Sequence, residues 1–167
     1  NYAYQEGEGG IAEALGLAEH WANGDSVVVV LGDNLIENNI ASAVVAFQAQ
    51  GGGAKILLKE VEDPERFGVA TLEGEHVTRI VEKPKEPESN LAVIGIYMYD
   101  GRVWDIIHEL KPSDRGELEI TDVNNWFIED GSMTCEVLDG WWTDAGTFES
   151  LHSASKLVAE GGANKLG

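Results

Sequence analysis

A run of five aliphatic residues that ends near a carboxylate is the strongest constraint on the fold of this chain. The stretch "SVVVVLGDN" covers residues 26–34, and no polar residue interrupts its four valines and one leucine. Runs of this kind are typical of strands covered on both faces, in sheets that carry helices on each side. Residues 27–31 therefore predict a buried strand, and Asp33 follows directly after its end.

The segments that come next predict an α/β fold. Apolar residues recur at every third or fourth position across 36–49, which indicates an amphipathic helix. The stretch "KILLKEV" at 55–61 then has the composition of a second strand. A strand, a helix and a strand in this order form a βαβ unit, which predicts a parallel sheet with a right-handed crossover.

The remaining pattern predicts one domain, 1–167, with a Rossmann-like, mixed and mostly parallel sheet and helices on both faces. Further strands are predicted at 67–74, 76–84, 91–100 and 134–140, and helices at 10–23, 103–110, 120–131 and from Thr147 onward. Thr121 and Thr147 are the predicted N-caps of the last two helices. The closing helix is expected to turn four apolar residues inward: Phe148, Leu151, Ala154 and Val158.

The charge balance excludes some classes of partner. The chain has 11 basic and 30 acidic residues, a formal net charge of −19. Such a surface repels nucleic acid and anionic membranes, so a site for phosphate needs a metal ion or a local lysine. No apolar stretch approaches the roughly 18 residues of a membrane span. The single cysteine excludes an internal disulfide and favours a cytoplasmic location.

Two aspartates follow predicted strands and are candidate metal ligands. In open α/β sheets ligands bind beyond the carboxyl ends of the strands, where Asp33 lies. Asp144, in "GWWTDAGT", occupies a similar turn before the closing helix. Together they could share one Mg²⁺ with phosphate oxygens. The alternative is that each aspartate caps the helix that follows it.

The stretch "VEKPKEP" offers a second candidate site at the end of an apolar strand. Glu82 could accept hydrogen bonds from sugar hydroxyls, and Lys83 could supply a positive charge for a phosphate. Pro84 favours an extended conformation of Lys83 and a fixed direction for the pair. A solvated surface pair before a turn is the alternative.

Six motifs occur here in the order found in sugar nucleotidyltransferases: "YQEGEGGIAEAL", "LGDN", "RFGV", "EKPKEPESNLAVIGIYMYD", "RGELEITDVN" and "GWWTDAGTFESL". The chain resembles this family from residue 2 to about 158, and within it the glucose-1-phosphate thymidylyltransferases. The resemblance implies transfer of a nucleotidyl group from dTTP to glucose 1-phosphate, with Mg²⁺ as cofactor and pyrophosphate as second product.

The resemblance also implies a role for individual residues. It places the nucleotide base at Gln5 and Gly10, Mg²⁺ at Asp33 and Asp144, the glucose pocket at Gly68, Glu82, Val93, Tyr97 and Trp142, and the sugar phosphate at Lys83. Asp33, Lys83 and Asp144 form the implied catalytic set. Phe67 stands where many relatives have tyrosine, so one hydroxyl contact of the family is missing.

One family feature does not occur in these 167 residues. The glycine-rich loop of the form G-G-x-G-T-R-L, which follows the family's first strand and wraps the triphosphate, is absent. We therefore expect a truncated domain with impaired transferase activity, and a homo-oligomer that compensates for the missing strand. The alternatives are an inactive module that binds sugar phosphate or nucleotide, and a Mg²⁺-binding receiver domain, which would explain Asp33 alone.

Overall fold

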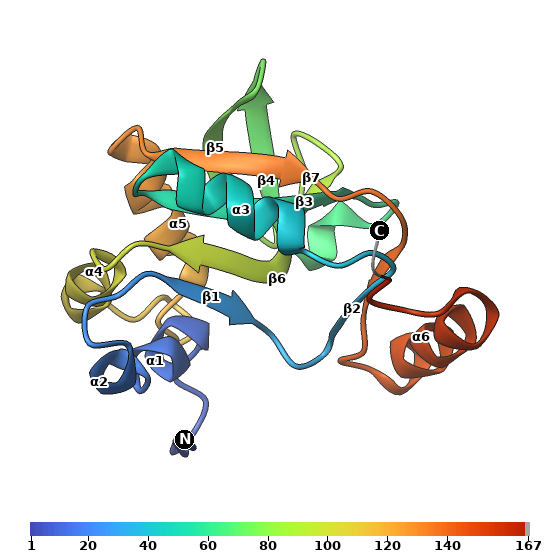
Figure 1. Cartoon of the computed structure of the whole chain (residues 1–167), viewed down its shortest axis with the longest axis horizontal. Coiled ribbons are helices and arrows are strands. Elements are labelled where there is room, and N and C mark those ends of the chain that lie inside the picture. The colour runs from blue at the N-terminus through green and yellow to red at the C-terminus, as the bar shows by residue number, and fades with distance from the viewer. Residues whose placement is uncertain (166–167) are drawn as a thin grey trace.

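A mixed β-sheet forms the centre of the computed structural model, which describes residues 1–165. The strands of this sheet are β1 (Val27–Val30), β3 (Ala54–Glu60), β4 (Gly68–Glu73), β5 (His76–Glu82), β6 (Leu91–Tyr99) and β7 (Met133–Val137). They follow the order β5-β4-β6-β3-β7, and β1 also pairs with β6 (Figure 1). The predicted α/β class and mixed sheet are confirmed.

Strand β6 organises this sheet because three other strands pair with it. β3 runs antiparallel along one edge, while β4 and β1 share the other edge, β4 near Val93 and β1 from Ile96 to Tyr99. β1, β3, β4 and β7 consequently point one way, and β5 and β6 point the other way. The strands predicted at 27–31 and 55–61 point the same way, as expected in a parallel sheet, but β6 lies between them and runs antiparallel to both. Neighbours are therefore mostly antiparallel, and β3 with β7 is the parallel pair within residues 1–165.

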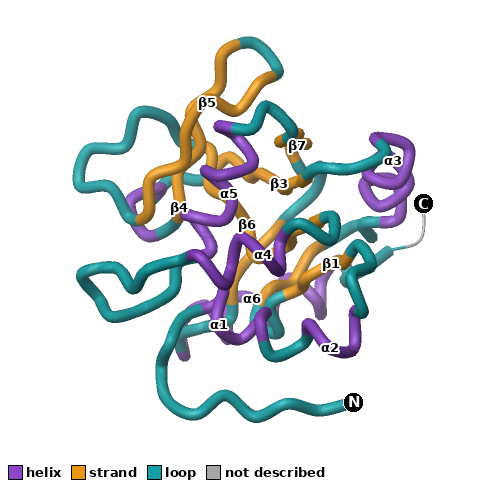
Figure 2. Tube along the Cα trace, turned by 90° about the vertical axis from the view of Figure 1, so that its left-hand side faces the viewer, coloured by secondary structure: helices purple, strands orange, loops and turns teal. Residues whose placement is uncertain are grey.

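Helices cover both faces of the sheet, as predicted. α1 (Ile11–Gly16), α4 (Val103–Glu109) and α5 (Ile120–Glu129) pack on one face, where they form the larger core cluster with β3 and β6. α3 (Ala41–Gln50) packs on the opposite face against residues of β3 and β6 that point the other way. The two helical layers can be followed in Figures 1 and 2.

Strand β1 differs from its prediction because it is covered on one face only. Val27 and Val29 pack against the larger core, whereas Val28 and Val30 are 43 % and 53 % exposed. Successive side chains of a strand point to opposite faces, so half of the apolar run faces outward. Within residues 1–165 the second edge of β1 carries no strand.

Two predicted helices begin or continue differently. The helix predicted at 10–23 is split into α1 and α2 (Glu19–Ala22) by a turn at Leu17 and Ala18. The helix predicted from residue 36 begins at Ala41, because the preceding residues form β2 (Asn34–Ile36). β2 pairs antiparallel with β8 (Trp142–Asp144), a strand that the sequence pattern presented as a turn.

The closing helix α6 (Phe148–Gly161) begins as predicted and packs differently. Thr147 is its N-cap, and the Thr147 Oγ1 accepts a 3.1 Å hydrogen bond from the backbone of Ser150. Of the predicted inward row, Ala154 is buried, whereas the others are exposed by 37–94 %. α6 lies to the side of the main sheet, near β8, so most of its apolar positions face no other element (Figure 1).

No helix within residues 1–165 is both long enough and apolar enough to span a membrane.

Candidate functional site

The small β2–β8 ladder brings the two candidate metal ligands together. Asn34 is paired with Asp144, and the Ala145 backbone N–H donates to the Asp33 carbonyl over 2.7 Å. A Cβ placed on Gly146 would lie 3.4 Å from the Asp144 Oδ2 and 3.5 Å from the Asp33 Oδ2. The two carboxylate oxygens are therefore no farther apart than the sum of these distances, and both border the space beside Gly146.

Neither aspartate has the alternative role of a helix cap. The N-cap of α3 is Ile40, which makes no side-chain capping bond, and that of α6 is Thr147. Asp33 and Asp144 thus lie on the link from β1 to β2 and at the end of β8, with their carboxylates free of the helix termini.

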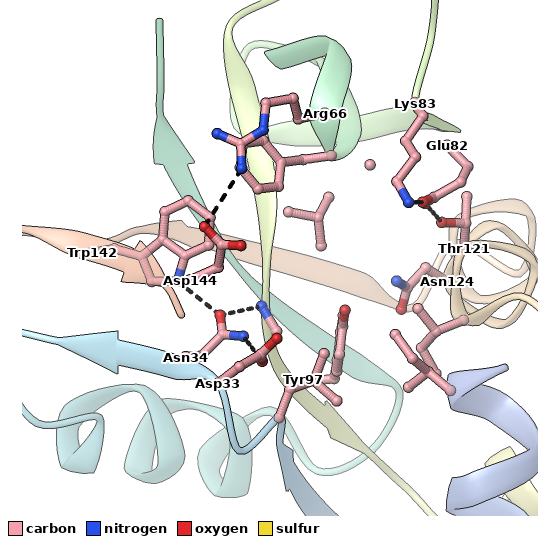
Figure 3. A pocket seen from close by; sticks show the side chains of 17 residues that line it. Asp33, Asn34, Arg66, Glu82, Lys83, Tyr97, Thr121, Asn124, Trp142 and Asp144 are labelled. Atoms are coloured by element: carbon pink, nitrogen blue, oxygen red, sulfur yellow. Dashed lines mark hydrogen bonds and ion pairs between the residues drawn. The ribbon is translucent and has the colours of Figure 1, made fainter. Parts of the chain in front are cut away.

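Asn34 ties this side of the site together, and no sequence signal identified it. Its Oδ1 accepts hydrogen bonds from the Gly95 backbone N–H at 2.9 Å and from the Trp142 Nε1 at 2.7 Å. Its Nδ2 donates to the Asp33 Oδ1 over 2.9 Å. One amide thereby connects the β1–β2 link, the central strand β6 and β8, and it orients the Asp33 carboxylate (Figure 3).

The opposite side of the site is formed by the last residue of β5 and the residue after it. The Glu82 Oε2 accepts a 2.8 Å hydrogen bond from the Thr121 hydroxyl, so Thr121 holds Glu82 in place. The prediction that Thr121 is the N-cap of α5 is wrong, because Glu119 occupies that position. The Glu82 Oε1 lies 3.7 Å from the Arg115 guanidinium and 3.9 Å from the Lys83 Nζ.

Lys83 has a backbone conformation that contradicts the predicted extended one. Its φ is +42°, in the left-handed region, which non-glycine residues seldom occupy. Its N–H donates to the Phe67 carbonyl over 2.9 Å, and this tertiary bond prevails over the local effect of Pro84. Strained backbone of this kind is typically found at binding sites, where the surrounding structure holds it in place.

A cavity of about 260 Å³ lies between the two sides (Figure 3). Eight of the predicted site residues line it: Asp33, Gly68, Glu82, Lys83, Val93, Tyr97, Trp142 and Asp144. Its volume is near the lower end of ligand cavities, which typically measure about 300–1,000 Å³. The cavity is lined by carboxylates, cations and aromatic rings together, which suits a small polar ligand.

The two residues predicted to contact a nucleotide base lie beside this cavity, not in its wall. The Gln5 Nε2 donates to the Gly10 carbonyl over 3.1 Å and to the Glu13 carboxylate over 2.6 Å. Gly10 has a φ of +92° and packs against Leu118, which leaves no room for a side chain. Ile11, the next residue, does line the cavity.

An arginine that the sequence did not single out adds a cation beside Asp144. Arg66 ends the short helix η1 (Pro64–Arg66), and its guanidinium lies 2.6 Å from the Asp63 carboxylate and 3.9 Å from the Asp144 carboxylate. The guanidinium also lies over the Phe67 ring, and that ring packs edge-on against Trp142. Phe67 thus contributes an apolar surface between Arg66 and Trp142.

Tyr97, on β6, forms part of the cavity floor and keeps its proton. Burial raises the pKa of Tyr97 well above its usual range, and the nearby charges of Glu82 and Asp33 raise it further. Its hydroxyl is therefore a donor at any ordinary pH.

The two aspartates of the cavity suit a Mg²⁺ ion that also binds phosphate and water better than they suit a metal ion enclosed by protein ligands alone. No group of three or more histidine, cysteine or acidic side chains within residues 1–165 could enclose a metal ion. Mg²⁺ typically takes one or two carboxylates and completes its shell with phosphate oxygens and water. Asp33 and Asp144, which face one space next to cationic side chains, match this requirement.

The sequence is similar to those of known nucleotidyltransferases. The family profile described as nucleotidyl transferase matches residues 1–161. The chain is 42 % identical to the low-salt glycan biosynthesis nucleotidyltransferase Agl11 of Haloferax volcanii, over 95 % of the chain and 45 % of the relative. It is 41 % identical to a glucose-1-phosphate thymidylyltransferase of Neisseria meningitidis, over 95 % of the chain and 56 % of the relative. The chain thus spans about half the length of these relatives.

Solved structures have the same fold. A Bacillus anthracis protein, assigned as a glucose-1-phosphate thymidylyltransferase and solved with a sucrose, is 50 % identical with a TM-score of 0.90, and the match covers 100 % of this chain and 67 % of that one. A UDP-glucose pyrophosphorylase in complex with UDP-glucose is 25 % identical with a TM-score of 0.85, over 96 % and 66 % of the two chains. The fold, the ordered motifs and the family profile agree: the chain belongs to the nucleotidyl transferase family.

Proposed function

We propose that these residues form the sugar-phosphate and metal-binding part of a nucleotidyltransferase that joins dTTP and glucose 1-phosphate to give dTDP-glucose and pyrophosphate. One observation carries this proposal. Four charged residues from three separate segments, Asp33 and Asp144 on one side and the adjacent Glu82 and Lys83 on the other, line the same cavity. Two relatives that cover most of this chain are named for glucose 1-phosphate or solved with a glucose nucleotide.

The sugar ring occupies the part of the cavity between Gly68, Val93 and Glu82. Gly68 lies at the start of β4, and a Cβ there would come 3.3 Å from the Glu82 carboxylate, so a larger residue would crowd the place where that carboxylate meets the ring. Glu82, held by Thr121, accepts hydrogen bonds from sugar hydroxyls. Its orientation is set before the ligand arrives, which lowers the entropic cost of binding.

The sugar phosphate lies toward Lys83, whose side chain is 54 % exposed and has only a 3.9 Å contact with Glu82. An ion pair this long and this exposed contributes little, so Lys83 can exchange it for a phosphate oxygen. The transfer reaction is an in-line displacement in which the phosphate oxygen attacks the α-phosphorus of the nucleotide. Positioning and charge neutralisation account for most of the catalysis in such reactions.

Asp33 and Asp144 hold Mg²⁺, which when bound neutralises charge on the phosphates. Asn34 orients Asp33 for this task, and the β2–β8 ladder fixes Asp144. Gln5 and Gly10 contact the nucleotide base at the start of α1. The glycine-rich loop motif that wraps the triphosphate does not occur in the 167 residues, so we expect this chain by itself to bind glucose 1-phosphate and to turn over slowly.

Calorimetric titration tests the binding function directly. The chain is titrated with glucose 1-phosphate, dTTP and UTP, each with and without Mg²⁺. We expect glucose 1-phosphate to bind, Lys83→Ala to weaken it about tenfold or more, and Asp33→Asn to abolish the effect of Mg²⁺ on dTTP. Lys85→Ala, two residues away and outside the cavity lining, is the matched control. No binding of glucose 1-phosphate, or equal losses in both lysine variants, would contradict the proposal.

Formation of dTDP-glucose distinguishes an impaired enzyme from an inactive binding module. Slow but measurable turnover that disappears in Asp144→Asn supports the enzyme. Binding of glucose 1-phosphate with no turnover supports the inactive module. Turnover near the roughly 1–10³ s⁻¹ of ordinary enzymes would show that these 167 residues are active without a glycine-rich loop.

A further inference from the structure

A buried asparagine at the floor of the cavity has half of its amide unused. Asn124 lies on α5, is 1 % exposed and belongs to the cavity lining. Its Oδ1 accepts a 2.7 Å hydrogen bond from the Tyr99 hydroxyl. Its Nδ2 has no hydrogen-bond partner among the described residues. Figure 3 shows this side chain close to Thr121, with the amide directed toward the cavity.

The oxygen of this amide is bonded to a tyrosine in the core. Tyr99 is fully buried and stacked between Tyr97 and Phe127, with ring centroids 6.1 Å and 5.7 Å away. Burial raises the pKa of Tyr99 well above its usual range, so the hydroxyl keeps its proton, and in the structure it donates this proton to the Asn124 Oδ1. Because the amide oxygen is bonded to Tyr99, the NH₂ group is the end of the amide that has no partner beside the cavity.

An unused donor at this place is unfavourable unless a ligand satisfies it. A buried polar group without a partner destabilises the folded protein, and native proteins satisfy nearly all such groups. The other buried orphan within residues 1–165, the Trp104 Nε1, does not line the cavity. Asn124 is therefore the one whose missing partner a bound molecule can provide.

The neighbouring groups indicate which chemistry this partner has. The Thr121 hydroxyl, one helical turn before Asn124, donates to Glu82, whose carboxylate remains an acceptor on the same side of the cavity. A donor beside an acceptor matches a sugar hydroxyl, which can accept one hydrogen bond and donate another.

We propose that the Asn124 Nδ2 donates a hydrogen bond to one hydroxyl of the sugar ring, so that Asn124 helps to determine which sugar phosphate binds. This inference rests on the proposed function of the cavity. It adds a specificity residue to the set of residues that the resemblance implied.

A double variant, Tyr99→Phe/Asn124→Leu, tests the role without leaving a new buried orphan. Both partners of the hydrogen bond are replaced by apolar groups of similar shape, which can be nearly neutral for stability. Binding of glucose 1-phosphate and of its 2-, 3-, 4- and 6-deoxy analogues is measured calorimetrically for the natural chain and the double variant. Asn90→Leu, an exposed asparagine outside the cavity, is the matched control.

We expect the double variant to bind glucose 1-phosphate about tenfold more weakly, as the loss of one well-placed hydrogen bond predicts. One deoxy analogue should bind the natural chain at least about tenfold more weakly than the parent, and this ratio should be several-fold smaller in the double variant, where only the hydrogen bond to Glu82 remains to be lost. That coupling identifies the hydroxyl, and a purely structural role of Asn124 would not produce it.

Two outcomes would overturn the inference, and they have different meanings. If the natural chain binds glucose 1-phosphate and every analogue shows the same ratio to the parent in both proteins, Asn124 does not contact the sugar while the proposed function stands. If the natural chain does not bind glucose 1-phosphate, the proposed function fails and the inference fails with it.

Discussion

Replacing Asn34 by alanine tests the view that one amide holds the metal-binding side of the site together. The substitution removes the acceptor for two donors, the buried Gly95 N–H and the half-buried Trp142 Nε1. A buried N–H without a partner costs about 1–3 kcal/mol, and the indole, which water can partly reach, about 0.5–1.5 kcal/mol. The expected destabilisation is therefore about 1.5–4.5 kcal/mol, or roughly 3–18 °C in Tm for a domain of this size.

Urea unfolding followed by tryptophan fluorescence measures this loss. Asn38→Ala is the control, because the Asn38 amide is exposed and makes one 3.3 Å bond to a backbone carbonyl; its change should stay within about 0.5 kcal/mol. Asn34→Asp separates the two halves of the amide. It keeps the acceptor oxygen, so most of the stability should return, but it places a like charge beside Asp33 and removes the donor to it.

The same variants connect stability with cation binding. Because the Asn34 Nδ2 orients the Asp33 carboxylate, Asn34→Ala should also weaken the effect of Mg²⁺ on dTTP binding, whereas Asn38→Ala should not. The reasoning is refuted if Asn34→Ala unfolds within 0.5 kcal/mol of the natural chain, or if it behaves like Asn38→Ala in both measurements.

Three further predictions concern other parts of the chain. Gly95→Ala should destabilise the protein and weaken Mg²⁺-dependent binding, because its Cβ would lie 2.5 Å from the Asn34 Nδ2, whereas Gly32→Ala, with no atom within 4 Å, should change neither; thermal unfolding compares the two. Partial burial raises the pKa of Asp100, but hydrogen bonds from the Arg102 side chain and from backbone N–H groups overcome this and lower it. The stability that ionised Asp100 contributes should be fully present above the ordinary aspartate pKa of 3.8 and should be lost as the pH falls through the lower pKa of the folded state. Plots of Tm against pH for the natural chain and for Asp100→Asn should therefore converge in acid, and a difference in Tm that stays constant with pH would contradict this. Replacing Val28 and Val30, which are exposed on the open face of β1, by threonine should reduce self-association through that apolar face, and light scattering that shows a monomer before the change would rule out the expected homo-oligomer.

The parts of the fold that local pattern determines were predictable, and pairings between distant segments were not. The periodicity located most strands and helices, because it reflects which side chains a single element buries. The run of valines at β1 could not reveal that one face is open, since an apolar strand looks the same whether one or both faces are covered. The β2–β8 ladder, with three residues in each strand, leaves no periodic signal, although it brings Asp33 and Asp144 together.

The candidate site shows the same division between local and tertiary information. The resemblance implied the charged residues of the cavity, but not Asn34, Arg66, Thr121 or Asn124, which hold or complement them from other elements. Lys83 is the clearest case of tertiary structure prevailing over local preference. Pro84 favours an extended Lys83, yet the hydrogen bond from the Lys83 N–H to Phe67 accompanies a φ of +42°. Such departures from local rules are expected at functional positions.

The cations around the cavity explain how a chain with a net charge of −19 could accept a phosphate. Arg66, Lys83 and Arg115 lie 3.7–3.9 Å from carboxylates of the site, at the long end of ion-pair distances. Exposed pairs of this kind are worth about 0–1 kcal/mol, so a phosphate oxygen can replace the carboxylate at little cost. Arg66 keeps its place meanwhile through the 2.6 Å contact with Asp63. The carboxylates freed by this exchange would face the same space as the phosphates, and their repulsion is the reason why we expect nucleotide binding to depend on Mg²⁺.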